Sequence, residues 1–146
     1  MDNQDINDLI KEKMLLAKMA CFDHNRNAIG KRNCIYEEYQ AILDYEEKKG
    51  VQKDHPEVMR KQIDRFKKEG YPKNNGLITA PILIRKHSDP EIIKVMEAWW
   101  KIVLNESKRD QLCFNYVVWK HNFTNYEFID GDVRKRNPWF YTIRHN

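Results

Sequence analysis

The segment from Ser107 to Gln111 carries the side chains best suited to chemistry in this sequence. The carboxylate of Asp110 can act as a general base, and the neighbouring Arg109 and Gln111 can hydrogen-bond a polar substrate. Ser107 and Asp110 also have the spacing of a helix N-cap and its third helical residue, in which case Asp110 would only satisfy backbone donors. On the residues alone, the cap is the simpler interpretation.

Two pairs of acidic residues also suggest chemistry. Asp130 and Asp132, on either side of Gly131, could share a divalent cation, because hard cations prefer carboxylate oxygens. The same Asp-Gly pair is equally an ordinary turn after a strand. Glu37 and Glu38 could form a catalytic acid pair, but acidic residues in the first turn of a helix also stabilise its dipole. For both pairs we favour the structural interpretation.

Aromatic residues provide two candidate binding surfaces. Trp99-Trp100 and Trp119 can stack on a sugar, although aromatic residues at helical spacing more often belong to a core. The stretch 131–146 is basic and aromatic, which suits a single-stranded nucleic acid or an anionic glycan, but a docked tail with a solvated basic rim explains it as well. This stretch contains Arg134, Lys135, Arg136, Arg144, Trp139, Phe140 and Tyr141.

The composition indicates a folded chain with a mild basic excess. Among 146 residues, 26 Lys and Arg face 22 Asp and Glu, and the net charge of +4 permits an anionic partner without requiring one. The five glycines cannot be assembled into a P-loop or a GxGxxG motif, which excludes these phosphate-binding loops. The apolar runs are too short for a membrane span, and the polar N-terminal residues do not form a signal peptide.

The cysteines and histidines do not form a recognisable metal motif. Cys21, Cys34 and Cys113 are odd in number and widely spaced, so we expect buried free thiols and a reducing, cytoplasmic location. Cys21, His24 and Cys34 match no standard zinc spacing, and no CxxC or HExxH motif occurs. We therefore assign no metal ligands.

The apolar pattern predicts a helix-dominated α/β fold, with about five helices and one or two short strands, in a single domain of residues 1–146. Asp54 and Glu57 have the spacing of a capping box, with Pro56 in the first turn of the helix that follows. Pro81 is expected to restrict the pairing of its strand. The expected helices are 5–20, 35–49, one from the Asp54 capping box to Gly70, one opening at 88–91, and 107–121; the expected strands are 77–85 and 126–129.

An ordered set of segments suggests a family. These are RNCIYEE (32–38), QIDRFKKEGYP (62–72), NGLI (75–78), IRKH (84–87), Trp99-Trp100 and SKRDQLCFNYVVWK (107–120). Together they resemble the glycosyltransferase-like domain of the turgor-regulation-defect and mucilage-related proteins. The resemblance covers about residues 5–120 and is most specific around Arg109-Asp110-Gln111.

The resemblance implies a relative of the GT-A nucleotide-sugar transferases, in which an acidic residue lies near the reacting sugar. By position, Asp110 is the candidate for that catalytic acid. A divalent cation such as Mn²⁺ or Mg²⁺ is usual in such enzymes, but Asp130 and Asp132 are not at the position of the family's metal motif. The residues that the resemblance places in the substrate cleft are Arg109, Gln111, His24, Arg32, Glu37, Arg85 and His87.

The resemblance also implies a function. It corresponds to the C-terminal portion of the family's domain, so we expect a separate donor-binding half as a partner and little activity without it. The expected activity is transfer of a sugar from a nucleotide-sugar to a hydroxyl acceptor in polysaccharide or glycan assembly. The alternative is a non-catalytic module that binds nucleic acid or an anionic glycan through the basic aromatic C-terminus.

Overall fold

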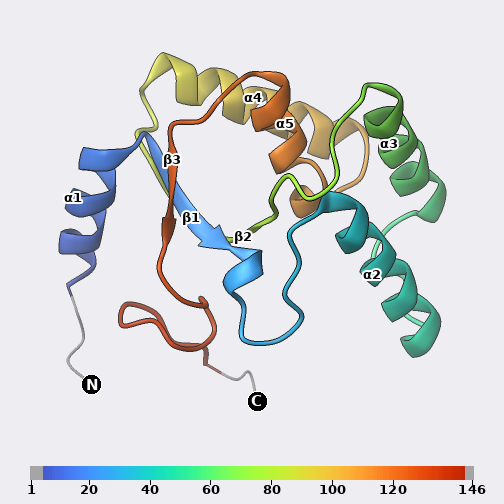
Figure 1. Cartoon of the computed structure of the whole chain (residues 1–146), viewed down its shortest axis with the longest axis horizontal. Helices are drawn as coiled ribbons and strands as arrows, with labels where there is room; N and C mark the ends of the chain where they lie inside the picture. Colours follow the sequence, from blue (N-terminus) through green and yellow to red (C-terminus); the bar gives the residue numbers. More distant parts are fainter. Residues whose placement is uncertain (1–4, 144–146) are drawn as a thin grey trace.

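The computed structural model describes residues 5–143, in which five α-helices surround a small three-stranded sheet (Figure 1). The predicted helix-dominated α/β class is confirmed, with one strand more than expected. The elements are α1 (Ile6–Leu16), β1 (Met19–Asp23), the 3₁₀ helix η1 (His24–Arg26), α2 (Ile35–Lys49), α3 (Pro56–Lys68), β2 (Ile78–Arg85), α4 (Pro90–Asn105), the 3₁₀ helix η2 (Asp110–Leu112), α5 (Phe114–Lys120) and β3 (Tyr126–Ile129).

The unexpected strand, β1, is the centre of the sheet. It pairs antiparallel with β2 and parallel with β3. Met19 and Cys21 face one apolar cluster, whereas Ala20 and Phe22 face the other, and all four side chains are fully buried. The prediction of a helix through residue 20 is therefore wrong, because α1 ends at Leu16. A short apolar run does not distinguish a helix end from a buried strand, and pairing with β2 and β3 decides it.

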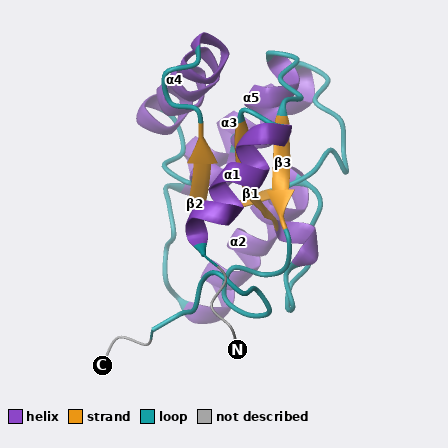
Figure 2. Ribbon diagram, turned by 90° about the vertical axis from the view of Figure 1, so that its left-hand side faces the viewer, coloured by secondary structure: helices purple, strands orange, loops and turns teal. Residues whose placement is uncertain are grey.

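The sheet separates two layers (Figure 2). The helices α2–α5 cover one face, and α1 with the C-terminal segment covers the other. In that segment Trp139 and Phe140 pack against the cluster around Phe22, so their rings act as part of the core. Tyr141 is exposed, and Arg144 lies outside the described residues. Within residues 5–143, no helix combines the length and the apolar character needed to cross a membrane.

Strand β2 is interrupted at Pro81, as the sequence predicts. Cys21 pairs with Leu83 and the next residue, Phe22, pairs with Thr79, so the three residues between Thr79 and Leu83 bulge out of the ladder. Proline has no backbone N–H to donate, which explains why the ladder breaks there.

The start of β2 is held by the segment that leads into α5. The amide side chain of Asn115, which is buried, accepts a hydrogen bond from the Ile78 N–H at 3.1 Å. Gln111 Nε2 donates to the Ile78 carbonyl oxygen at 2.6 Å. Gly76 precedes this contact with φ of +92°, and a Cβ there would lie 2.8 Å from Asn115 Nδ2. Only glycine fits this close approach without a shift of the asparagine.

The start of α3 differs from its prediction. His55 is the N-cap of α3 and makes no side-chain capping bond, so the expected Asp54–Glu57 capping box is wrong. The carboxylate of Asp54 instead faces the loop after α4, where its Oδ2 accepts from Ser107 Oγ at 2.6 Å and from the Lys108 N–H at 2.9 Å. A long-range partner has replaced the local cap.

The same contacts explain why α5 starts later than predicted. The expected helix 107–121 begins only at Phe114. Ser107 is fully buried, and its N–H donates to Gln62 Oε1 at 3.1 Å, while Gln62 Nε2 donates to the Leu112 carbonyl oxygen at 3.4 Å. Because α3 binds these backbone groups, residues 107–112 follow a loop and the short η2 helix rather than a regular α-helix.

We expect Asp54→Asn to lower the free energy of unfolding at neutral pH by about 2 kcal/mol, because hydrogen bonds to a buried charged group are strong. Burial favours the neutral acid, but hydrogen bonds from Ser107 and from the His55 and Lys108 N–H groups outweigh it and hold the pKa of Asp54 below its usual value. The charged form is thus favoured in the folded state.

The stabilisation from Asp54 should therefore be lost as the pH falls through the lowered pKa of the folded state. Urea unfolding at a series of pH values measures the difference between wild type and Asp54→Asn, which should shrink in acid. Asp64→Asn is the control, because Asp64 is exposed and pairs with Arg60 only across one helical turn. Equal effects of the two substitutions would contradict the role of Asp54.

Candidate functional site

The segment 108–110 lies between two pockets and contributes to both. Lys108 and Asp110 line one pocket, whereas Arg109 lines the other. The backbone of Arg109 is extended, with φ of −78° and ψ of 90°, and successive side chains of an extended chain point to opposite sides. The segment 108–110, which overlaps the most specific stretch of the resemblance, thus divides its three charged side chains between two pockets.

We call the first site the indole pocket; it has a volume of about 420 Å³. Trp99 Nε1 donates to the carbonyl oxygen of Asp110 at 3.0 Å, which fixes the ring of Trp99 relative to that residue. Trp100 is 61% exposed, so its ring is available to a ligand. The pocket is lined by Arg85, Met96, Trp99, Trp100, Val103, Lys108 and Asp110.

The carboxylate of Asp110 is exposed and lines the indole pocket. Its Oδ1 accepts a hydrogen bond from the Gln111 N–H at 2.7 Å, and Ser107 is engaged with Asp54 instead. The Ser107–Asp110 capping box is therefore not formed. Because Asp110 is exposed, its carboxylate can accept a hydrogen bond or a proton from a bound molecule.

We call the second site the cationic pocket; it has a volume of about 310 Å³. Arg32 Nε lies 2.6 Å from Glu38 Oε2, and this ion pair forms part of the wall. His24 lies beside the pair, with its Nε2 at 3.4 Å from an Arg32 guanidinium nitrogen and at 3.9 Å from Glu38 Oε2. The lining consists of Arg32, Glu38, Ala41, Ile42, Tyr45, Lys53, Arg109 and Arg134.

The predicted site residues therefore fall into separate groups. His87 lies with Arg85 in a smaller pocket of about 200 Å³ along α4. Gln111 uses its amide to bind the backbone of β2, which positions the segment rather than a substrate. Glu37, which the resemblance places in the cleft, is exposed, whereas its neighbour Glu38, which the resemblance does not place there, is buried beside Arg32. Asp110 and Arg85 share the indole pocket, while His24, Arg32 and Arg109 gather at the cationic pocket.

The acidic pair at 130 and 132 forms a turn, as favoured by the sequence. The carboxylate of Asp132 accepts from the N–H groups of Ala28 and Arg134, both at 2.9 Å, and Asp130 pairs with Arg26 at 3.1 Å. Within residues 5–143, no three His, Cys, Asp or Glu side chains are grouped to hold a metal ion. These carboxylates do not fit the divalent cation that the resemblance implies, and we derive no step through a metal.

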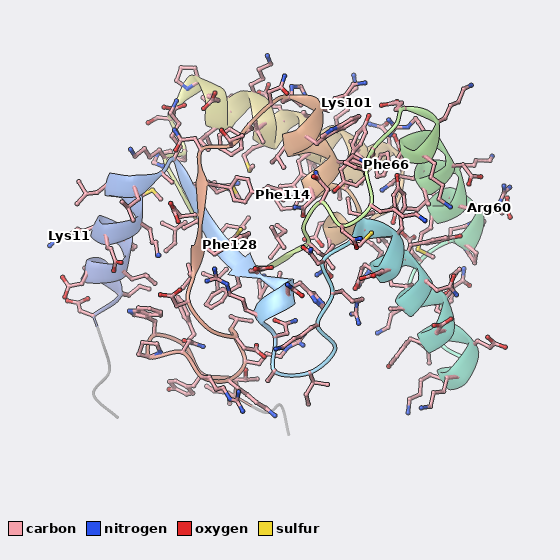
Figure 3. All side chains as sticks on the ribbon, viewed as in Figure 1. Lys11, Arg60, Phe66, Lys101, Phe114 and Phe128 are labelled. Carbon is pink, nitrogen blue, oxygen red and sulfur yellow. The ribbon has the colours of Figure 1, made fainter. Side chains whose placement is uncertain are left out.

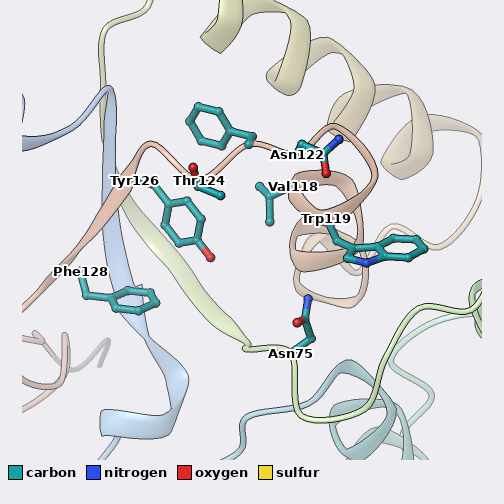
Figure 4. Close-up of a pocket in the computed structure, with 8 residues that line it drawn as sticks. Asn75, Val118, Trp119, Asn122, Thr124, Tyr126 and Phe128 are labelled. Carbon is teal, nitrogen blue, oxygen red and sulfur yellow. The ribbon is translucent and has the colours of Figure 1, made fainter.

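A third pocket, of about 480 Å³, lies between α5 and β3 (Figure 4). Tyr126 and Phe128 on β3 line it together with Trp119, Asn75 and Thr124. It contains none of the predicted site residues, although Trp119 was among the residues that could stack on a sugar. Its uncharged lining distinguishes it from the other two sites.

The cysteines are free and buried, as predicted. Burial raises the pKa of both Cys21 and Cys113 to about 12, so neither thiol is a nucleophile at neutral pH.

Comparison of the chain with protein-family models, with curated proteins and with solved structures finds no match. The glycosyltransferase-like resemblance stays a prediction, and the pockets themselves are the basis for a functional assignment.

The buried imidazole of His24 gives a prediction about pH. Burial lowers the pKa of His24, and Arg32 and Arg134 lower it further, while Glu38 partly opposes them. The unfolded chain therefore binds a proton at a pH where the folded chain does not. Stability should fall as the pH drops below about 6.5, the value for an unperturbed histidine.

Urea unfolding of wild type and His24→Gln at neutral and mildly acid pH tests this. The loss of stability between the two conditions should be smaller in the variant, because its side chain does not titrate. His121→Gln, at an exposed histidine, should behave like wild type. The same loss in His24→Gln as in wild type would show that another group causes it.

Proposed function

We propose that this chain binds a sugar in the indole pocket and supplies Asp110 as the acidic residue of a glycosyl transfer from a nucleotide-sugar to a hydroxyl acceptor in glycan assembly. The observation that carries the proposal is the exposed carboxylate of Asp110 in one pocket with the rings of Trp99 and Trp100 and the cation Arg85. The resemblance described above adds to it, since it names the same carboxylate.

The lining of the indole pocket matches the chemistry of a sugar. One face of a hexose is apolar and packs on an indole ring, while its hydroxyl groups need charged or polar partners. Trp100 offers an exposed ring, and Asp110 and Arg85 offer an acceptor and donors in the same pocket. A pocket with an apolar wall and a few convergent polar groups is typical of small-molecule sites.

The proposed reaction assigns a proton transfer to Asp110. The acceptor hydroxyl oxygen attacks the anomeric carbon of the sugar, and the bond from that carbon to the phosphate oxygen breaks. The carboxylate of Asp110 takes the hydroxyl proton, and the nucleoside diphosphate leaves with the electron pair. Two hydrogen bonds keep Asp110 in position. The Trp99 indole N–H donates to the carbonyl oxygen of Asp110, and the side chain of the next residue, Gln111, donates to the backbone of β2.

Sugar binding is tested by Trp100→Ala. We expect the affinity for a sugar to fall about fivefold, since an aromatic contact contributes about 1 kcal/mol and a factor of ten corresponds to 1.4 kcal/mol. The measurement is a titration of the chain with UDP- and GDP-hexoses and free hexoses, followed in NMR spectra through the indole N–H signals of Trp99 and Trp100 in wild type and through that of Trp99 in the variant.

Leu104→Ala is the matched control, because Leu104 is also exposed on α4 but does not line the pocket. It should bind like wild type. If no sugar or nucleotide-sugar in the panel shifts the two indole signals at millimolar concentration, the indole pocket is not a sugar site.

Catalysis is tested by Asp110→Asn. The amide oxygen can still accept from the Gln111 N–H, but it cannot take a proton at neutral pH, so turnover should fall about 100-fold or more. Sugar affinity should change little. The assay detects nucleoside diphosphate released from the same donors, with a mixture of saccharide acceptors, with and without Mn²⁺, and with a donor-binding half of the resembled family supplied.

Asp44→Asn removes an exposed carboxylate on α2 and serves as the control for the change in charge. Unchanged turnover in Asp110→Asn would exclude Asp110 as the base. Sugar binding without any turnover would reduce the proposal to a binding module.

A further inference from the structure

The cationic pocket gathers positive charge from parts of the chain that are far apart in sequence. Its four cations are Arg32 before α2, Lys53 after α2, Arg109 after α4 and Arg134 after β3. Among the described residues, Glu38 is the one carboxylate in the lining. Like charges that converge in a partly enclosed site repel each other, because the protein screens them less than water does. The pocket therefore favours an anion that would relieve this repulsion.

The carboxylate already present does not balance these cations. Glu38 is buried and lies 2.6 Å from Arg32. Within the described residues, Lys53, Arg109 and Arg134 have no carboxylate within ion-pairing distance. The Lys53 ammonium lies 4.5 Å from the centre of the Tyr45 ring, so the two guanidinium groups of Arg109 and Arg134 are the positive charges left uncompensated among the described lining residues.

Arg109 gives a second and independent indication. Its Nε atom is buried and has no hydrogen-bond partner among the described residues. Buried nitrogen donors are nearly always hydrogen-bonded in folded proteins, because an unpaired one loses its bond to water. Arg109 lines the cationic pocket, so a small shift of its guanidinium would bring this nitrogen to an acceptor oxygen bound in the pocket.

We propose that the cationic pocket binds a phosphate group, either as a free phosphate or diphosphate ion or as part of a small phosphorylated ligand. A guanidinium presents a planar pair of N–H donors that matches two phosphate oxygens, and three arginines line the site. The uncompensated positive charges match the two or more negative charges of a phosphate or diphosphate better than the single charge of a carboxylate. No glycine-rich loop is involved.

Two structural features hold the arginines in place without neutralising the pocket. Asp132 accepts from the Arg134 N–H and so fixes the backbone from which that side chain extends. Ser107 Oγ accepts from the Arg109 N–H at 3.1 Å and is itself bound by Asp54. The site is therefore built on anchored backbone. It lies on the other side of the segment 108–110 from the indole pocket, and it does not depend on the proposed sugar transfer.

Calorimetric titration of the whole chain with phosphate, with pyrophosphate and with a phosphorylated hexose tests this proposal. All three probes should bind, pyrophosphate most tightly, and free hexose should not compete. Arg109→Gln and Arg134→Gln should each weaken pyrophosphate binding about tenfold, as expected for a charge-assisted contact worth about 1.4 kcal/mol. Arg109→Lys should be intermediate, because it keeps the charge but loses the planar donors.

Lys101→Gln is the control, because it removes an equal charge from an exposed position on α4, away from the pocket lining (Figure 3). Its pyrophosphate affinity should stay within about twofold of wild type. A pocket lined by charges of one sign focuses the electrostatic potential, whereas one exposed charge elsewhere on the surface changes that potential little. Thermal unfolding supplies a second readout: without a ligand the two arginine variants should be at least as stable as wild type, and pyrophosphate should stabilise only proteins that bind it.

Three results would overturn the proposal. The first is no heat and no thermal stabilisation with any probe at millimolar concentration. The second is an equal loss of affinity in Lys101→Gln, which would mean non-specific attraction to a basic protein. The third is strong binding of single-stranded oligonucleotides that increases with their length and exceeds that of pyrophosphate, which would make the pocket part of an extended nucleic-acid surface.

Discussion

The hydrogen bonds that join Asp54 and Gln62 to the loop after α4 are the constraint on which both proposed sites depend. Residues 107–112 have little regular structure, yet Ser107 and Leu112 are fully buried, so their backbone groups need partners. Asp54 binds the Ser107 hydroxyl and the Lys108 N–H, and Gln62 binds the backbone at both ends of the segment. Only with this backbone fixed do the side chains at 108, 109 and 110 point reproducibly to their two pockets.

The two pockets differ in the balance of positive and negative charge in their linings. In the indole pocket the carboxylate of Asp110 faces two cations, Arg85 and Lys108, beside apolar rings. In the cationic pocket the carboxylate of Glu38 is already bound to Arg32 and Lys53 lies over the ring of Tyr45, whereas Arg109 and Arg134 have no ion-pair partner among the described residues. A mixed, partly apolar lining suits a neutral polyol, whereas an unbalanced cationic lining suits a phosphate. The difference in charge balance, more than pocket size, separates the two assignments.

Several features that carry charge in the sequence have structural roles in the fold. Asp132 fixes the turn before Arg134, and Asp54 organises a loop instead of capping its own helix. Trp139 and Phe140 cover the second apolar cluster rather than forming an open stacking surface. Such residues cannot be removed without disturbing the backbone that places the pocket residues, so the tests of the two pockets substitute residues that line the pockets instead.

The sequence by itself determined the elements whose signals are local. The helix at 35–49 follows from its apolar period, its acidic first turn and Gly50, which ends it with φ of 63°, and the strand at 126–129 lies where it was predicted. These predictions succeed because capping and periodicity act over a few residues. Asp110, in contrast, was selected through the resemblance, and its role stays a prediction.

Only the tertiary structure decided the features that depend on distant partners. Strand β1 exists because β2 and β3 pair with it on both sides, and α5 starts late because α3 binds the backbone before it. The cationic pocket combines Arg32, Lys53, Arg109 and Arg134, which share no local motif. A hydrogen bond or a cluster of charges between residues more than 20 positions apart leaves no spacing in the sequence, so it becomes visible only when the chain is folded.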